Sequence, residues 1–208
     1  MSTIKARDQA MQSYADLMEE IKSRLEGLNA AVNGRTALSP QLVKEFGYLQ
    51  LRMICELIAL SALIAHGDIP ATQKGELRTA WAADRIVKAL TELHPDFFPV
   101  PVRKEHQGNG HIHMAEAPPG ALTKEELITL VGRAGSILHR GHIKALMKTK
   151  SPVQHRYDDI VGWGMKIVAL LEQHRILFAD GRRVYYVALR AEQTQGKVLI
   201  VLGEASTD

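Results

Sequence analysis

A long apolar segment in the first third of the chain most restricts the fold. Ser39-Pro40 predicts the start of a helix, with the serine as N-cap and the proline in the first turn, and the helix is expected to reach about Ala65. From Phe46 onward this helix is apolar on nearly every face, which is typical of the central element of a bundle. Its most hydrophobic stretch, LIALSALIA at 57–65, is too short to span a bilayer. We therefore expect a helical core and no membrane association.

Further helices are predicted around this segment from apolar residues that recur every three or four positions. Thr123-Lys-Glu-Glu126 matches a capping box and predicts one helix start. The segment 95–121 is rich in proline and glycine and is expected to be irregular, with at most a short hairpin about Gly108-Asn109-Gly110. The predicted helices cover 4–28, 76–93, 123–138 and 156–174.

The sequence period changes after His174. ILFA (176–179), VYYVALR (184–190) and KVLIVL (197–202), separated by turn residues, predict three antiparallel strands. Two or three strands alone are marginally stable, so the strands should pack on the helices. The predicted fold class is α+β, mainly α: a helical bundle domain at 1–175 and a small C-terminal antiparallel β-meander at 176–208.

Composition restricts the setting of the chain. The 208 residues suit one domain, and 46% hydrophobic residues suffice for a core without metal or disulfide staples. The single cysteine, Cys55, cannot form an internal disulfide, which favours a reducing compartment. No apolar region follows the early basic residues of MSTIKARDQAMQ, so no export signal is expected. These features predict a cytoplasmic protein, and no glycine-rich phosphate loop, dinucleotide fingerprint or G-x-S-x-G elbow points to a cofactor.

The stretch RAGSILH (133–139) has an arginine and a histidine at its two ends. Arg133 and His139 lie at the start of a basic region, because no acidic residue occurs between Leu127 and Tyr157. A basic stretch beside an Arg/His pair suits binding of a phosphate backbone. The alternative is a solvated basic face and a helix end whose histidine interacts with the helix dipole. The candidate nucleic-acid contacts are Arg140, Lys144, Lys148, Lys150 and Arg156.

Two further polar groups are candidates for chemistry. Arg52 and Glu56 lie four residues apart in the apolar helix and should form an intrahelical pair. The pair either fixes the helix structurally, or Glu56 holds a catalytic arginine or histidine of a neighbouring helix. His106, His111 and His113 are weak metal-ligand candidates, because alternating histidines on a strand project to one side but no cysteine or acidic triad completes the set. No physiological metal is expected.

Three stretches carry a resemblance to known proteins: LRMICELIALSALIAHGD (51–68), AADRIVKALTELHPDFFPVPV (82–102) and LTKEELITLVGRAGSILHRGH (122–142). They resemble a family of uncharacterised bacterial proteins whose helical part is similar to the HEPN group (higher eukaryotes and prokaryotes nucleotide-binding domains). Many HEPN proteins are dimeric, metal-independent endoribonucleases of toxin or anti-phage systems, with an arginine and a histidine separated by four to six residues. Arg133 and His139 fit this spacing, whereas Ala134 replaces the polar residue that commonly follows the arginine.

The resemblance implies roles for this pair. His139 would act as general acid or base on the ribose 2′-hydroxyl or the leaving oxygen, and Arg133 would stabilise charge on the scissile phosphate. Three hypotheses remain open: an RNA-binding protein or endoribonuclease, a non-catalytic interaction or assembly module with an unidentified protein partner, and a metal-dependent enzyme using the histidine loop. We also expect a homodimer, because the apolar helix must be covered.

Overall fold

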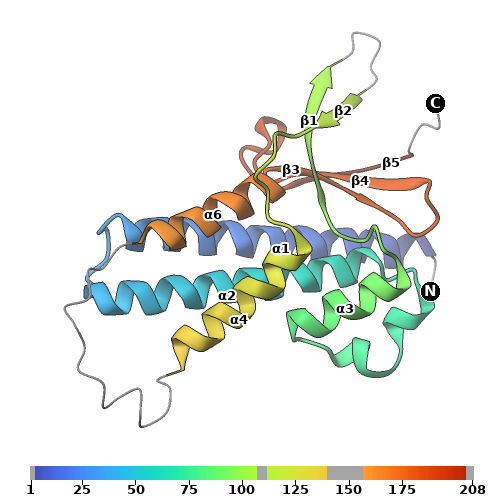
Figure 1. Cartoon of the computed structure of the whole chain (residues 1–208). Coiled ribbons are helices and arrows are strands. Elements are labelled where there is room, and N and C mark those ends of the chain that lie inside the picture. The colour runs from blue at the N-terminus through green and yellow to red at the C-terminus, as the bar shows by residue number, and fades with distance from the viewer. Residues whose placement is uncertain (1–2, 107–111, 140–156, 205–208) are drawn as a thin grey trace.

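The protein is described by a computed structural model that covers residues 3–106, 112–139 and 157–204. This part of the chain contains helices packed against an antiparallel sheet, so the predicted α+β, mainly α class is confirmed (Figure 1). The α-helices are α1 (Thr3–Val32), α2 (Pro40–Ala65), α3 (Ala83–Leu93), α4 (Lys124–Leu138) and α6 (Asp158–Leu171).

Helix α2 is the centre of the bundle, as its apolar faces predict. It contacts α1, α3, α4 and α6, and Ile54 and Ile58 are fully buried in the shared core. By length and composition α2 could cross a membrane, but 61% of its most apolar window is buried inside the protein. A core helix passes the same test, and the four neighbouring helices account for the apolar surface. The covering of α2 within one chain therefore removes the reason for which a homodimer was expected.

Capping chemistry explains where the helices begin more clearly than periodicity does. Thr123 caps α4 in the predicted capping box, since its side chain accepts from the Glu126 N–H and the Glu126 carboxylate accepts from the Thr123 N–H.

The helix predicted for 76–93 begins later than expected. Gly75–Thr79 forms a 3₁₀ turn and α3 begins only at Ala83. Trp81 lies exposed ahead of the helix.

The sheet is larger than predicted and is not confined to the C-terminus. Its order is β2-β1-β3-β4-β5, and every neighbouring pair is antiparallel. The three predicted strands exist as β3, β4 and β5, but β3 begins directly after α6. The other two strands come from the segment predicted to be irregular. The strands are β1 (Val100–His106), β2 (Ile112–Glu116), β3 (Gln173–Leu177), β4 (Arg183–Ala188) and β5 (Leu199–Glu204).

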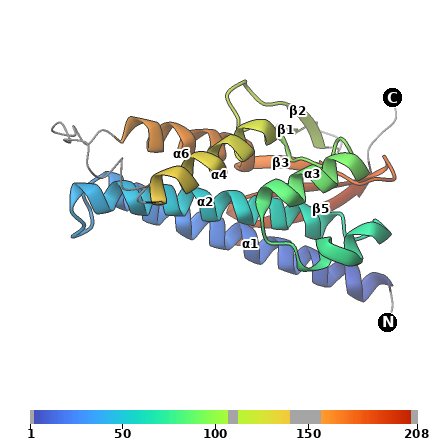
Figure 2. The same ribbon diagram turned by 60° about the horizontal axis from the view of Figure 1, so that its bottom comes forward.

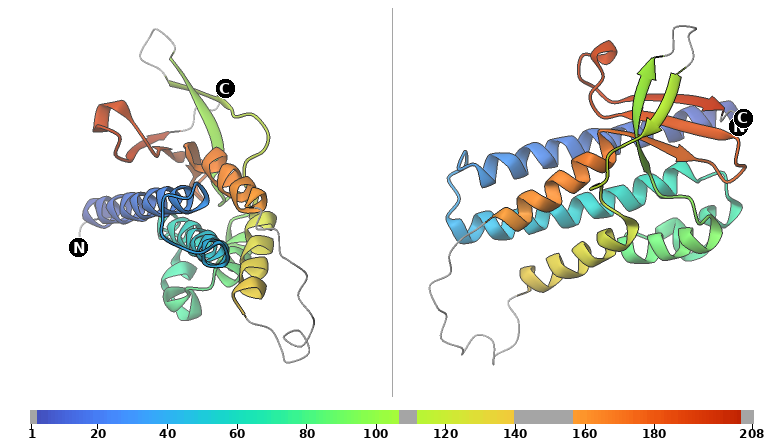
Figure 3. Two further views of the ribbon diagram at one scale, coloured as in Figure 1. Left: turned by 90° about the vertical axis from the view of Figure 1, so that its left-hand side faces the viewer. Right: turned by 45° about the horizontal axis from the view of Figure 1, so that its top comes forward.

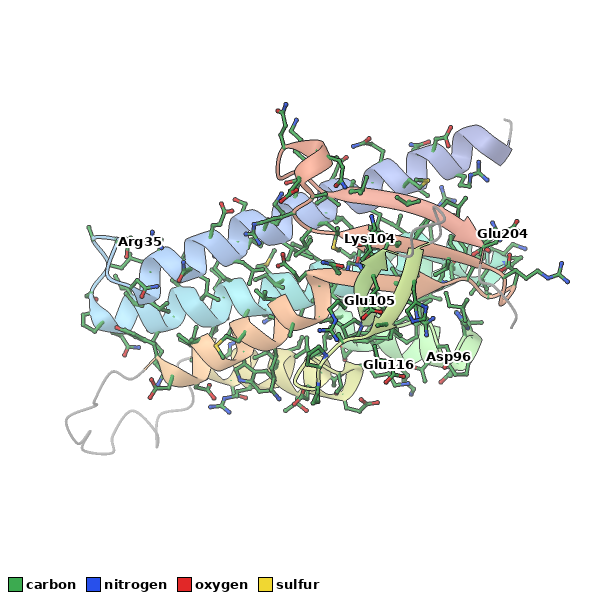
Figure 4. The ribbon with its side chains drawn as sticks, turned by 90° about the horizontal axis from the view of Figure 1, so that it is seen from above. Arg35, Asp96, Lys104, Glu105, Glu116 and Glu204 are labelled. Carbon is green, nitrogen blue, oxygen red and sulfur yellow. The ribbon has the colours of Figure 1, made fainter. Side chains whose placement is uncertain are left out.

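The β1–β2 hairpin confirms the hairpin predicted about Gly108-Asn109-Gly110, since His106 pairs with Ile112, but its strands are longer than a short hairpin would have. Val100 and Pro101 pair with β3, whereas the rest of β1 pairs with β2 and projects away from the helices (Figure 3). Its charged side chains include Lys104, Glu105 and Glu116, which Figure 4 labels. One face of the hairpin packs on the sheet, since Val102 is 5% exposed and clusters with Tyr186 and Ala188, and Met114 packs against them.

The sheet and the bundle share one hydrophobic core. Ile176, Tyr185 and Val187 of the sheet pack in the same cluster as Tyr14 of α1 and Ile58 of α2. The sheet lies over the N-terminal half of α1, with its strands crossing the end of the bundle at which α3 lies (Figures 1 and 2). The strands thus form part of the folded core, and the apolar sheet face is covered as expected for so few strands.

Candidate functional site

The predicted catalytic pair lies at the exposed end of α4. Arg133 has 48% of its side chain exposed. His139 is the exposed C-cap residue, and its extended backbone (φ −80°, ψ 130°) leaves the helix there. Six residues of ideal helix separate the two side chains by about 120°. Within the described residues no hydrogen bond or ion pair joins Arg133 to His139, so the chain by itself does not bring them together.

Arg133 instead belongs to a cluster drawn from three helices. Its Nη2 lies 2.8 Å from Oδ2 of Asp159, at the start of α6. The same Oδ2 accepts a hydrogen bond from the hydroxyl of Tyr48, in α2. Burial raises the pKa of the Tyr48 hydroxyl, and the neighbouring Asp159 carboxylate raises it further, so the tyrosine stays a neutral donor. The arrangement holds the Arg133 guanidinium in one place.

A glycine explains why these helices come close enough for the cluster to form. A Cβ on Gly47 would lie 2.8 Å from Cδ1 of Ile160, so only glycine allows α6 to pack this tightly on α2. Tyr48 follows Gly47 and Asp159 precedes Ile160, so the close approach places the hydroxyl beside the carboxylate. Sequence reasoning missed Tyr48 and Asp159. Asp158 and Asp159 form an acidic pair in the first turn of α6, which is typical of any helix N-terminus and therefore did not indicate a site.

The ion pair between Arg133 and Asp159 also joins two separate parts of the chain. Arg133 is in the last turns of α4 and Asp159 in the first turn of α6, so the pair closes the base of the segment between these helices. This is the basic segment of the sequence, whose candidate contacts Arg140, Lys144, Lys148, Lys150 and Arg156 lie outside the described residues. The pair therefore joins the two helices between which this segment lies in the sequence.

Arg52 and Glu56 form the intrahelical pair that the sequence predicts. Nε of Arg52 donates to Oε1 of Glu56 at 3.0 Å. The pair lines a groove of about 990 Å³ between α2, α3 and α4, next to Trp81. The carboxylate of Glu56 is thus engaged by its own helix. The described residues give it no contact with Arg133 or His139, and the structural interpretation of the pair is the one supported.

The histidine candidates for a metal are only partly covered. His106 ends β1, and His113 of β2 lies opposite Glu105 in the register of the hairpin. His111 lies outside the described residues. In the portion that was searched, no three His, Cys, Asp or Glu residues are grouped to hold a metal ion. The histidine loop remains a prediction.

Comparison of the chain with models of protein families, with curated proteins and with solved structures found no match. The resemblance to HEPN proteins therefore remains a prediction drawn from the quoted motifs.

Proposed function

We propose that the protein binds the phosphate backbone of RNA where the basic segment joins the fold, with Arg133 as the contact fixed by the fold. The supporting observation is the Arg133–Asp159–Tyr48 cluster. It holds a half-exposed guanidinium at the base of a stretch that carries positive charge and no acidic residue from Leu127 to Tyr157.

The cluster suits a phosphate contact for two reasons. A guanidinium has five N–H donors, and the side chain of Arg133 stays 48% exposed while it is paired with Asp159, so donors remain for a phosphate. A guanidinium already held by a carboxylate also loses less side-chain entropy on binding. Asp159 neutralises part of the charge, so Arg133 positions the backbone, and the neighbouring Lys and Arg residues supply most of the electrostatic attraction.

RNA cleavage is the catalytic form of the same proposal. His139 lies six residues beyond Arg133 at the exposed helix end, where an imidazole can reach bound RNA. Cleavage would need no metal, would leave a 2′,3′-cyclic phosphate, and would require Arg133 and His139 to reach one phosphate. A second copy of the chain is one source of the missing partner, since the two side chains make no contact within one chain.

The binding proposal can be tested by fluorescence anisotropy with a labelled single-stranded RNA. Arg133→Gln should weaken binding about fivefold, the loss expected for one charge-assisted contact. Arg103→Gln removes the same charge from the exposed hairpin and should change the affinity less than about twofold. If both substitutions weakened binding equally, Arg133 would contribute only through its charge, and the proposal would be contradicted.

Cleavage is tested separately, with chelator present. Activity that survives the chelator and is lost in His139→Ala supports the endoribonuclease form. Binding without cleavage leaves a non-catalytic RNA-binding protein, of the kind also expected from the resemblance.

A second candidate function is a non-catalytic assembly module, and α6 carries the observation that favours it. Val161, Met165 and Val168 form an exposed apolar stripe, and Met165 is 65% exposed. The three residues line a groove of about 570 Å³ between α1 and α6. An exposed apolar face of this kind can be covered by the same face of a second copy across a two-fold axis. Met165→Glu should then convert a dimer to a monomer in sedimentation experiments, whereas Ile128→Glu on exposed α4 should not.

A further inference from the structure

The groove between α2, α3 and α4 lies close to the Arg133 cluster. Val131 of α4 lines this groove, and Arg133 follows two residues later on the same helix. Two residues of helix place these side chains on opposite sides of α4, with the exposed Gly132 between them. The groove and the guanidinium are thus about 10–12 Å apart, the diameter of one helix. A single bound strand can contact both, because Gly132 presents no side chain between them.

Trp81 lines the same groove with its indole largely uncovered. It is 66% exposed, more than any other large hydrophobic side chain in the described residues. It lies between the 3₁₀ turn Gly75–Thr79 and the start of α3. Within the described part of the chain its N–H has no hydrogen bond, and no ring contacts its faces. An exposed aromatic face of this kind is the platform on which nucleobases stack.

The charges of the groove favour a nucleobase over a phosphate. The lining holds three basic and four acidic residues. Arg52 and Glu56 pair with each other, so the groove has a small excess of negative charge and does not attract a polyanion. A base is neutral and carries both donors and acceptors, which side chains of both signs can meet. The remaining charged residues are Glu76, Asp84, Arg85, Lys88 and Glu92.

We propose that this groove is a nucleobase subsite, in which a base of single-stranded RNA stacks on Trp81 while the backbone is held at Arg133. The inference rests on the proposed RNA binding and adds the class of RNA that the site selects. The groove volume of about 990 Å³ is at the upper end of the range of small-molecule sites, so a base and its ribose fit. Duplex RNA is excluded, because its bases are not free to stack on a side chain.

The test measures binding of the full chain to a labelled oligoadenylate by fluorescence anisotropy, with an abasic strand of equal length as the second probe. Trp81→Ala should weaken oligoadenylate binding about tenfold, the loss expected for one stacked base, and Trp81→Phe should keep most of the affinity. The wild type should bind the abasic strand about tenfold more weakly, and Trp81→Ala should weaken that binding no further.

Two controls separate stacking from an effect on folding. Leu93→Ala removes an exposed apolar side chain from the other end of α3 and should leave the Kd for oligoadenylate unchanged. Trp81→Ala should leave Tm nearly unchanged, because the side chain is exposed. The chain has two tryptophans, so the fluorescence of Trp163→Phe reports Trp81 alone. Oligoadenylate should quench it and the abasic strand should not.

Salt dependence distinguishes this inference from the proposed phosphate contact. Stacking releases no counterions, so Trp81→Ala should keep the slope of log K against log salt concentration, whereas Arg133→Gln should reduce it. Equal affinity of the wild type for the two strands, or an unchanged Kd in Trp81→Ala, would overturn the nucleobase subsite even where Arg133→Gln reduces the slope. Weaker binding in Trp81→Ala without any effect of Arg133→Gln would support the subsite and contradict the phosphate contact.

Discussion

Lowering the pH from 6.5 to 4 should destabilise the protein through His174. This side chain is fully buried at the start of β3, where the sheet meets α1. Its Nδ1 lies 3.0 Å from the Leu171 carbonyl oxygen and its Nε2 lies 2.7 Å from the Tyr14 hydroxyl. A carbonyl only accepts, so Nδ1 carries the hydrogen and Nε2 accepts from Tyr14. The site therefore accommodates a neutral imidazole, and burial lowers the pKa of His174 to about 4.

The sign and size of the effect follow from linkage. Above pH 6.5 the histidine is neutral in both the folded and the unfolded chain, so it adds no pH dependence. Between pH 6.5 and 4 the unfolded chain binds a proton that the folded chain does not, and stability falls as the pH falls. The pKa difference between 6.5 and about 4 corresponds to about 3 kcal/mol at pH 4. Burial also lowers the pKa of His66, which acts in the same direction.

Urea unfolding at pH 7.5, 6.5, 5.5 and 4.5 measures this loss. His174→Gln should lower stability at pH 7.5 but flatten the profile, since glutamine does not titrate. His113→Gln changes an exposed histidine and should keep the wild-type profile. Hydrogen bonds from Arg183 lower the pKa of Asp180 to about 2. This carboxylate therefore affects stability only below about pH 4. An unfolding free energy that stays constant from pH 6.5 to 4.5, or an unchanged slope in His174→Gln, would refute the reasoning.

Two further predictions concern the packing and capping of the helices. Gly47→Ala should destabilise the protein by about 1–3 kcal/mol because its Cβ would meet Ile160 at 2.8 Å, whereas Gly162→Ala, with no atom within 4 Å, should stabilise it by about 0.5–1 kcal/mol. Equal effects in chemical denaturation would contradict the account of the α2–α6 contact. Thr123→Ala removes the acceptor for the Glu126 N–H and should cost about 1 kcal/mol, and a loss below about 0.3 kcal/mol would show that the capping box contributes little.

The sequence was most informative where local chemistry determines the structure. The Thr123 capping box placed the start of α4 correctly, because the cap is satisfied by its own neighbours. Ser39-Pro40 placed the start of α2 through the proline in the first turn, since the Ser39 side chain makes no capping hydrogen bond. The pairing of Arg52 with Glu56 followed from helix geometry alone. The hairpin about Gly108-Asn109-Gly110 followed from its turn residues, but the pairing of β1 with β3 did not, because it depends on residues more than 70 positions away.

The candidate site was predictable only in part. Arg133 was identified by its spacing from His139 and by the acid-free stretch that follows it. Its partners were not, since Tyr48 and Asp159 are 111 residues apart and meet through the close packing at Gly47. No spacing rule along one chain connects residues so distant. Because Arg133 pairs with Asp159, it is a positioned cation and not a free one on the surface.

The most direct test of the proposed function is the salt dependence of RNA affinity for the wild type and for Arg133→Gln. Each phosphate contact on a single strand contributes about −0.7 to the slope of log K against log salt concentration. If Arg133 contacts one phosphate, the substitution should reduce the slope by about 0.7, and Arg103→Gln should leave it unchanged. A slope that is identical in wild type and Arg133→Gln, or affinity that is insensitive to salt, would contradict the claim that this cluster binds the RNA backbone.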